Sequence, residues 1–198
     1  MKRAPRCVGS LTGFLLMLAA SASPAGAQAS VTKESMVNQL AGLETAPDID
    51  VAALRQQALD RVKSRADGVA LQRPPIAAQL LKLPQFAVEV QFDPDSPIVR
   101  PQSYPMLGRI ADALYDPALL SYSFLIVGHT DATGKREYNL TLSQRRASSI
   151  RDVLVTTFKI SPKRIQAVGL GEEQLLDAAH PTAAINQQVQ VVTVGKAL

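Results

Sequence analysis

The stretch VGHTDATGKREYNLTLSQRRA, residues 127–147, carries the strongest structural signal in this chain. An apolar run at residues 121–127 leads into it, and a helical pattern at residues 136–158 leaves it. Because the run is apolar on both faces, it is typical of a central strand. The polar residues that begin at Gly128 then form a loop at the strand's end, where α/β folds commonly place ligand-binding groups. The stretch therefore predicts a strand–loop–helix unit with a candidate site in its loop.

The helix of this unit carries two adjacent arginines that face different surroundings. At about 100° per residue, Arg146 lies within the apolar arc that begins at Leu142, whereas Arg145 lies outside it. We therefore expect Arg145 to be solvated and Arg146 to point toward the sheet. An unpaired guanidinium in that position is costly, so Arg146 requires an anion.

Asp131, in the preceding loop, is the natural local candidate for that anion. Spacing alone favours an internal salt bridge between Asp131 and Arg146, which would hold the loop on the helix. The alternative is a split site, in which the aspartate binds a ligand ammonium and the arginine binds a ligand carboxylate through two parallel hydrogen bonds. A zwitterionic amino-acid centre would fit that pair.

The C-terminal part of the chain, residues 85–198, alternates strand and helix patterns. Residues 86–92 alternate apolar and polar side chains, residues 106–114 have helical spacing, and the sequence VQVVTV forms a final strand. RIQAVGLG, residues 164–171, is interpreted as a short strand ending in a glycine turn. The order β-α-β-α-β-β predicts an α/β fold in the form of a layered sandwich.

The preceding part, residues 28–84, has two short helical patterns separated by proline. Met36 and Leu40 recur in the first, and Asp50 is placed to cap the second. Both apolar stripes are narrow. We therefore expect a helical appendage or linker without its own core, which acts as a spacer or binds envelope proteins.

Residues 1–27 have the basic, apolar and small-residue order of a secretory signal peptide. The alternative is an uncleaved anchor, although the apolar run is shorter than the 20 or so residues that span a membrane. Cleavage would leave 18 of the 21 Lys and Arg residues against 17 Asp and Glu. This near balance argues against a nucleic-acid partner, since such proteins normally keep a basic stripe on the folded part.

Cysteine and histidine usage argues against metal, cofactor or nucleophilic chemistry. Cys7, the one cysteine, precedes the apolar run instead of following the cleavage site, so we expect no lipid anchor. The two histidines, His129 and His180, are too far apart in sequence to suggest a metal site. His129 with Asp131 and Ser143 lacks the sequence context of a hydrolase triad. We expect His129 to be a structural hydrogen-bonding residue and the protein not to be an enzyme.

Three motifs in order, GHTDATG, YNLTLSQRRA and VGLGEE, resemble the OmpA-like peptidoglycan-binding domain family. That family includes the C-terminal domain of outer-membrane protein A, peptidoglycan-associated lipoprotein and MotB. The upstream VQFDPDSPIVRPQSYPML resembles the family's first strand and following helix, so the likeness covers about residues 85–194. It implies the same β-α-β-α-β-β fold and a periplasmic protein that binds the peptide stem of peptidoglycan at meso-diaminopimelate.

The resemblance also implies which residues hold the ligand. Asp131 and Arg146 match the aspartate and the second arginine that hold the charged centre of diaminopimelate in the family. Five more positions match residues that line, shape or adjoin that pocket: Phe92, Asp93, Thr130, Asn139 and Leu142.

One departure from the family concerns Gln187 and Gln188, which stand where the family usually has two arginines. If those arginines help to hold the ligand, binding here would be weaker or structurally altered. The departure supports an alternative function, a structural or assembly module that keeps the fold and binds a protein partner.

Overall fold

The computed structural model describes residues 31–45, 47, 49–64 and 74–196. The expected signal peptide, residues 1–27, and Cys7 within it lie outside the described residues. All described residues belong to one compact unit, residues 31–198.

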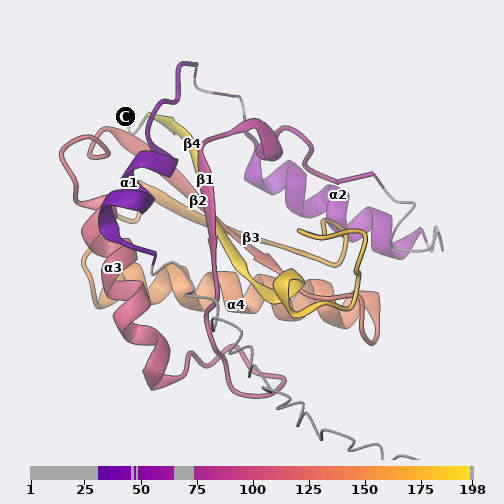
Figure 1. The fold of residues 1–198 in the computed structure, drawn as a ribbon. Helices are drawn as coiled ribbons and strands as arrows, with labels where there is room; N and C mark the ends of the chain where they lie inside the picture. Colours follow the sequence, from indigo (N-terminus) through magenta and orange to yellow (C-terminus); the bar gives the residue numbers. More distant parts are fainter. Residues whose placement is uncertain (1–30, 46, 48, 65–73, 197–198) are drawn as a thin grey trace, which may run out of the picture. The chain divides into compact units, whose positions relative to one another are not determined.

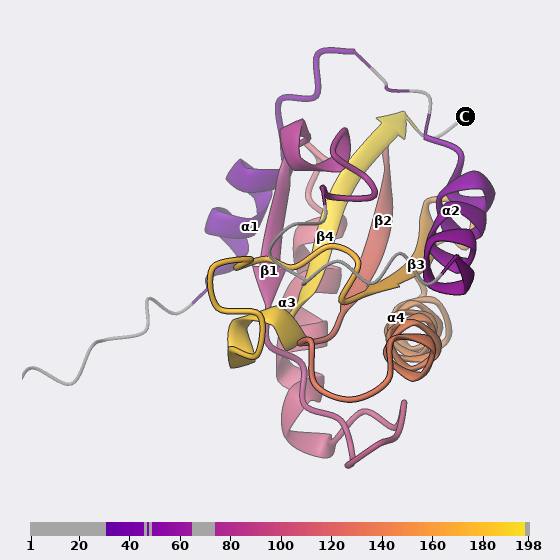
Figure 2. The ribbon, with the colours of Figure 1, turned by 90° about the vertical axis from the view of Figure 1, so that its right-hand side faces the viewer.

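The fold is a four-stranded sheet with helices on both faces, in the strand order β1-β4-β2-β3 (Figure 2). β2 is parallel to β3 and antiparallel to β4, which is antiparallel to β1. The elements are α1 (Lys33–Leu40), α2 (Val51–Lys63), η2 (Leu80–Lys82), β1 (Gln85–Val88), η3 (Pro101–Ser103), α3 (Tyr104–Leu114), β2 (Tyr122–His129), α4 (Arg136–Thr156), β3 (Ile165–Gly171), η4 (Ala184–Gln187) and β4 (Val189–Lys196). The predicted β-α-β-α-β-β order and the interior position of β2 are confirmed.

Two hydrophobic cores explain why β2 is apolar on both faces. Phe124 and Ile126 pack in the first core with side chains from α1, α3 and α4. Leu125 and Val127 pack in the second core with α2 and the segment around η2. Figure 1 shows α1 and α3 on one side of the strands and α2 on the other. Alternate residues of β2 therefore serve opposite layers.

The N-terminal helices form part of this packing. Met36 and Leu40 of α1 are fully buried in the first core, and Leu54 of α2 lies in the second. The expected cap of α2 is present, since the Asp50 carboxylate accepts a hydrogen bond of 3.0 Å from the Ala53 amide. The boundary expected at residues 84/85 therefore does not correspond to a break in packing. A narrow apolar stripe suffices for these helices because each buries one face against a preformed sheet.

We predict that Leu54→Ala destabilises the whole protein, because Leu54 is 3% exposed beneath the sheet. The expected loss is about 2–5 kcal/mol of unfolding free energy, measured by urea denaturation. Leu59→Ala is the matched control on the same helix, because Leu59 is 38% exposed. Two separate unfolding transitions, with only a minor one shifted by Leu54→Ala, would instead show that α2 is an independent appendage.

Two glycines bring α4 close to the sheet. A Cβ atom on Gly128 of β2 would lie 2.4 Å from the Ser143 carbonyl oxygen, and one on Gly169 of β3 would lie 2.1 Å from the Gln144 amide nitrogen. Both positions therefore exclude side chains. The turn expected at residues 169–171 is wrong, since all three residues lie within β3 and the turn follows at residue 172. Gly169 instead allows the close contact between helix and sheet.

Side chains from α2 and α4 close the outer edge of β3. The guanidiniums of Arg151 and Arg55 donate to the carbonyls of residues 165 and 167, at 3.0 and 3.2 Å. Gln144 and Ser143 accept from the amides of residues 169 and 171, both at 2.9 Å. This edge therefore offers few unpaired backbone groups, and α4 is fixed beside the loop that follows β2. Among the described residues, no helix is both long and apolar enough to cross a membrane.

Candidate functional site

The candidate site begins with Asp131, in the loop that joins β2 to α4. Asp131 is 8% exposed, and both of its carboxylate oxygens accept hydrogen bonds. Oδ1 accepts from the amide of Thr133, at 3.1 Å, and from its hydroxyl. Oδ2 accepts from Nε2 of Gln187, at 2.7 Å. All three donors are neutral, so they orient the carboxylate without cancelling its charge.

Asn139, on the first turns of α4, holds this loop in place. Its side-chain nitrogen donates to the carbonyls of Asp131 and Thr133, at 3.3 and 2.9 Å, and to Oε2 of Glu172, at 2.8 Å. Asn139 is predicted to be a pocket residue and does line the pocket. Its donors are engaged by the protein itself, so its role in the described structure is to shape the loop.

Arg146 lies one helix face away from Arg145, as the helical wheel predicts, with Arg145 exposed and Arg146 partly buried. Its Nε donates to the Ser96 carbonyl, at 3.2 Å, and its guanidinium carbon lies 4.8 Å from the centroid of the Phe92 ring. Burial lowers the pKa of Arg146, while nearby acidic groups, chiefly Tyr138, oppose that shift. Arginine remains protonated at neutral pH under such shifts.

The direct salt bridge favoured by spacing is not formed. Among the described residues, no carboxylate lies within ion-pair distance of Arg146. Gln187 contacts Asp131, while Ser96 and Phe92 contact Arg146. The terminal nitrogens of Arg146 have no hydrogen-bond acceptor within the described part of the chain. These two nitrogens are therefore available to an anion that the described part of the chain does not supply.

Asp131 and Arg146 line the same pocket, of about 280 Å³. Its walls comprise Asp95, Thr130, Asp131, Thr133, Gly134, Tyr138, Asn139, Leu142, Arg146 and Gln187. Five of the seven predicted site residues are thus brought together. The hydroxyl of Thr130 is buried and has no hydrogen-bond partner among the described residues.

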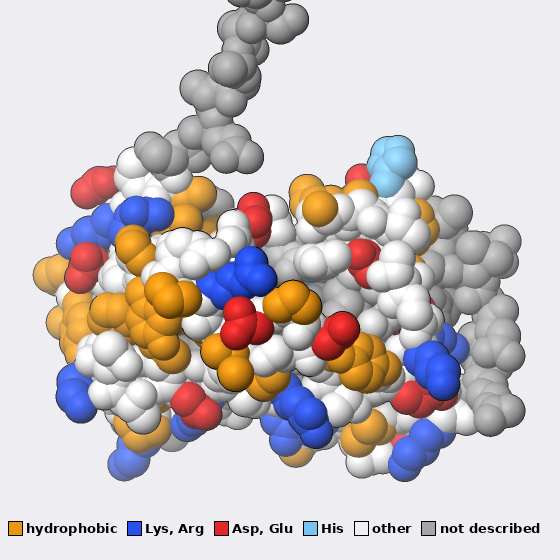
Figure 3. All heavy atoms as spheres, turned by 90° about the horizontal axis from the view of Figure 1, so that it is seen from below, with side chains coloured by type: hydrophobic (Ala, Val, Ile, Leu, Met, Phe, Trp, Pro, Cys, Tyr) orange, Lys and Arg blue, Asp and Glu red, His pale blue; other side chains and the backbone are white. Residues whose placement is uncertain are grey.

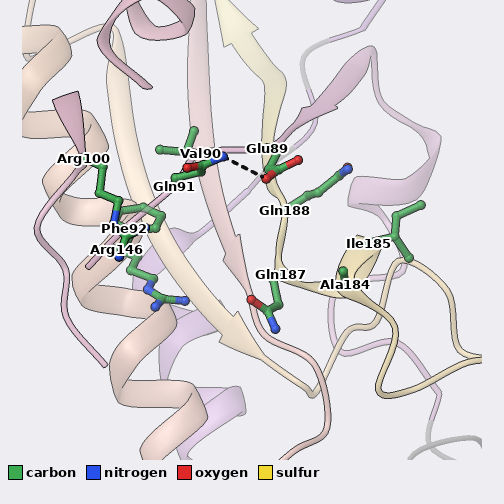
Figure 4. A pocket seen from close by; sticks show the side chains of 10 residues that line it. All are labelled: Glu89, Val90, Gln91, Phe92, Arg100, Arg146, Ala184, Ile185, Gln187 and Gln188. Carbon is green, nitrogen blue, oxygen red and sulfur yellow. Dashed lines mark hydrogen bonds between the residues drawn. The ribbon is translucent and has the colours of Figure 1, made fainter. Parts of the chain in front are cut away.

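The other two predicted residues, Phe92 and Asp93, lie outside this pocket. Phe92 supports Arg146 and lines a neighbouring pocket (Figure 4). Asp93 lines neither pocket. It pairs with Arg100 at 3.1 Å, and its amide donates to the Ile98 carbonyl at 2.9 Å. Asp93 therefore shapes the loop that supplies Phe92 and Ser96 to Arg146.

Five further pocket residues are not among the site residues predicted from the sequence: Asp95, Thr133, Gly134, Tyr138 and Gln187. Tyr138 had a usable signal, since positions 138, 142 and 146 recur every four residues and lie on one helix face. The sequence signal for Gln187 is its departure from the family pattern, which usually has an arginine at this position. Asp95 has a φ of 52° in a loop, and no sequence period points to it.

His129 is a buried hydrogen-bonding residue, as predicted. Its Nδ1 lies 2.7 Å from the Gln174 carbonyl and its Nε2 lies 2.9 Å from Oε1 of Gln190. Burial lowers the pKa of His129, and the two hydrogen bonds oppose that shift. Ser143 instead bonds to the backbone of residues 140 and 171, so His129 and Ser143 do not form a catalytic pair.

The described residues contain no group of three or more His, Cys, Asp or Glu side chains that is arranged to hold a metal ion. Figure 3 shows one face of the molecule, on which basic and acidic side chains are interspersed. That face resembles a mixed solvated surface more than the basic stripe of a nucleic-acid-binding protein.

Comparison with known proteins identifies the family of the stretch that carries these residues. A family model described as OmpA family matches residues 91–188, which include Phe92, Asp131, Arg146 and Gln187. Outer membrane porin F of Pseudomonas aeruginosa is 35% identical over 118 residues, covering 59% of this chain and 32% of that protein. Peptidoglycan-associated lipoprotein of Brucella melitensis is 34% identical over 103 residues, covering 52% of this chain and 60% of that protein.

Among solved structures, the peptidoglycan-associated lipoprotein of Burkholderia pseudomallei is 31% identical, with a TM-score of 0.44. The match covers 63% of this chain and 98% of that one. The chain thus spans about one third of the length of the porin F and about three fifths of the length of the Brucella lipoprotein. Through residues 91–188, this chain belongs to the OmpA family.

Proposed function

We propose that this protein binds peptidoglycan non-covalently, by holding the zwitterionic end of a diaminopimelate side chain between Asp131 and Arg146. In this proposal the protein is exported by its N-terminal signal, resides in the periplasm and performs no catalysis. Its role is to attach or position itself at the cell wall. The relative named peptidoglycan-associated lipoprotein supports peptidoglycan as the ligand.

The observation that carries the proposal is the guanidinium of Arg146. It is partly buried at a pocket wall, fixed through Nε and the Phe92 ring, and unpaired with any described carboxylate. A fixed planar fork is suited to two parallel hydrogen bonds with a carboxylate. A ligand carboxylate would supply the anion that Arg146 lacks within the described chain.

Asp131 supplies the complementary charge. Its carboxylate is held by the neutral donors of Thr133 and Gln187, so its negative charge is not neutralised by an ion pair. An ammonium group beside it would complete the pairing. The pocket of about 280 Å³ is suited to the end of an amino acid more than to a large ligand.

A site this small gives modest affinity for one stem peptide. Peptidoglycan presents the same peptide at high density, so retention at the wall arises from rapid rebinding to neighbouring stems. This behaviour fits a protein that positions itself on the wall without modifying it.

Asp131→Asn tests the proposal. Asparagine retains the size and still accepts from Thr133 through Oδ1, while its Nδ2 faces Gln187, whose amide must turn so that its oxygen accepts. The variant lacks the charge that holds an ammonium. We expect roughly tenfold or greater loss of affinity in co-sedimentation with purified diaminopimelate-type peptidoglycan, since one charge-assisted hydrogen bond contributes about 1.5–3 kcal/mol.

The matched control is Asp152→Asn, which removes an exposed carboxylate at the far end of α4, where it contacts Arg151. Circular dichroism and urea unfolding verify that both variants fold. Equal wall binding by the unmodified protein and a folded Asp131→Asn variant would show that Asp131 does not hold the ligand.

A further inference from the structure

A separate pocket, of about 390 Å³, lies where α2, α4 and β3 meet. Figure 2 shows α2 and α4 next to each other beside β3. α2 contributes Arg55 to this pocket, α4 contributes Ser148 and Arg151, and β3 contributes residues 166–167. The pocket shares no lining residue with the one that contains Asp131, and none of its described lining residues is Asp or Glu. It is therefore a distinct, positively charged hollow.

The backbone of β3 fixes the two arginines of this pocket. Nη2 of Arg55 donates to the Ala167 carbonyl at 3.2 Å, and Nε of Arg151 donates to the Ile165 carbonyl at 3.0 Å. Nε of Arg55 also donates to Oε1 of Gln144, at 3.2 Å. Because the two carbonyls are two residues apart on one edge strand, about 6.6 Å separates them. The guanidiniums are therefore held at a spacing that one anion with several oxygens can bridge.

Three donor groups at this pocket remain unused by the described chain. Nη1 of Arg55 and Nη2 of Arg151 have no acceptor among the described residues. Arg151 contacts Asp152 through Nη1, at 3.1 Å, but the Asp152 side chain is 65% exposed, and exposed pairs contribute little. The Ser148 hydroxyl oxygen accepts from Nε2 of Gln144 at 3.1 Å, so its hydrogen is left to donate.

These donors match a phosphate group more closely than a carboxylate. A phosphate monoester carries a charge of about −1.5 to −2 at neutral pH and presents three acceptor oxygens. A carboxylate has one charge and two oxygens. Two guanidiniums and one hydroxyl therefore correspond to both the charge and the oxygens of the monoester, and the planar guanidinium is suited to phosphate geometry.

We propose that this pocket binds a phosphate monoester group through Arg55, Arg151 and Ser148. The site lies on a different face of α4 from Arg146, since residues 148 and 151 are about 200° and 140° around the helix from it. The protein would thus hold the cell wall and a phosphate-bearing ligand at the same time. This inference does not depend on the proposed function, because the two sites share no residue.

The test is a titration of the purified protein with inorganic phosphate at constant ionic strength, followed by NMR of the backbone amides. We expect saturable shifts centred on residues 51–55 and 148–151. Arg55→Gln and Arg151→Gln should each weaken phosphate binding about tenfold, the effect of one charge-assisted hydrogen bond. Arg145→Gln is the matched control, because Arg145 is an exposed arginine on α4 that lines none of these pockets, and it should leave the affinity unchanged.

Two further comparisons keep the test decisive if an arginine variant fails to fold, which circular dichroism would show. Ser148→Ala removes one neutral donor and should weaken phosphate binding about threefold. Acetate should bind the unmodified protein at least tenfold more weakly than phosphate. Equal phosphate affinity in folded Arg55→Gln, Arg151→Gln and Arg145→Gln, or equal binding of acetate and phosphate, would overturn the site.

Vesicles distinguish the two sources of such a phosphate group. A lipid headgroup as the source predicts co-sedimentation with phosphatidylcholine vesicles that contain phosphatidic acid, no co-sedimentation with phosphatidylcholine alone, and loss of binding in Arg55→Gln. A soluble phosphate ester as the source predicts that the protein binds inorganic phosphate and remains in the supernatant with both kinds of vesicle. Binding to neither phosphate nor vesicles would overturn the proposal and leave wall binding untouched.

Discussion

Arg146→Ala is expected to lower affinity for a diaminopimelate-containing stem peptide by roughly 100-fold. The loss of one partner from a desolvated charge pair typically costs 2–5 kcal/mol, and 100-fold corresponds to about 2.7 kcal/mol. Arg146→Lys keeps the charge but lacks the planar fork, so an intermediate loss of about tenfold is expected. Calorimetry with the free peptide measures this effect without the rebinding that a dense wall provides.

Arg145→Ala is the matched control for that experiment, because Arg145 is the adjacent residue and is exposed. It removes the same charge from the same helix without touching the pocket, so affinity should change less than about twofold. Similar losses in the two variants would indicate a general charge effect and would contradict a specific role for Arg146.

Gly169→Ala is expected to have the largest effect on stability. The added Cβ would meet the backbone of α4, with the Gln144 amide nitrogen 2.1 Å away. Backbone on both sides cannot yield as a flexible side chain does, so α4 must move away from β3. Overpacking usually costs about 1–3 kcal/mol, and a loss at or above about 3 kcal/mol is expected here.

Thermal and urea unfolding measure this loss, with Gly108→Ala as the matched control. Gly108 lies within α3, and a Cβ there would meet the Phe158 ring at 3.5 Å, an ordinary contact. Because alanine favours helix more than glycine, Gly108→Ala should be neutral or stabilising by up to about 1 kcal/mol. A Gly169→Ala protein as stable as the unmodified one would show that α4 does not require this close approach.

The sequence was sufficient to predict the elements whose signals are local. β2 is apolar on both faces because both faces are buried, and that pattern identified it as a central strand. Arg145 and Arg146 differ in burial because they lie on different faces of one helix. Asp50 caps α2 through a contact three residues away. Each of these features depends on a period or a short-range hydrogen bond that a single sequence displays.

Features that depend on distant segments were harder to predict. Spacing paired Asp131 with Arg146, but Asp131 is contacted by Gln187, which lies 56 residues along the chain. Arg146 is contacted by Ser96, which precedes it by 50 residues. These partners come from loops whose relative positions are set by the completed sheet. The N-terminal helices have the sequence pattern of an appendage for the same reason, since their apolar stripes do not reveal the sheet that covers them.

Recognition of both charges of the diaminopimelate end is tested by comparing two types of wall. Lysine-type peptidoglycan carries an ammonium at the same place but lacks the adjacent carboxylate. We predict that the protein co-sediments with diaminopimelate-type peptidoglycan and remains largely in the supernatant with lysine-type peptidoglycan, since Arg146 then has no partner. Equal binding to both walls, or binding to neither, would contradict recognition of both charges by Asp131 and Arg146.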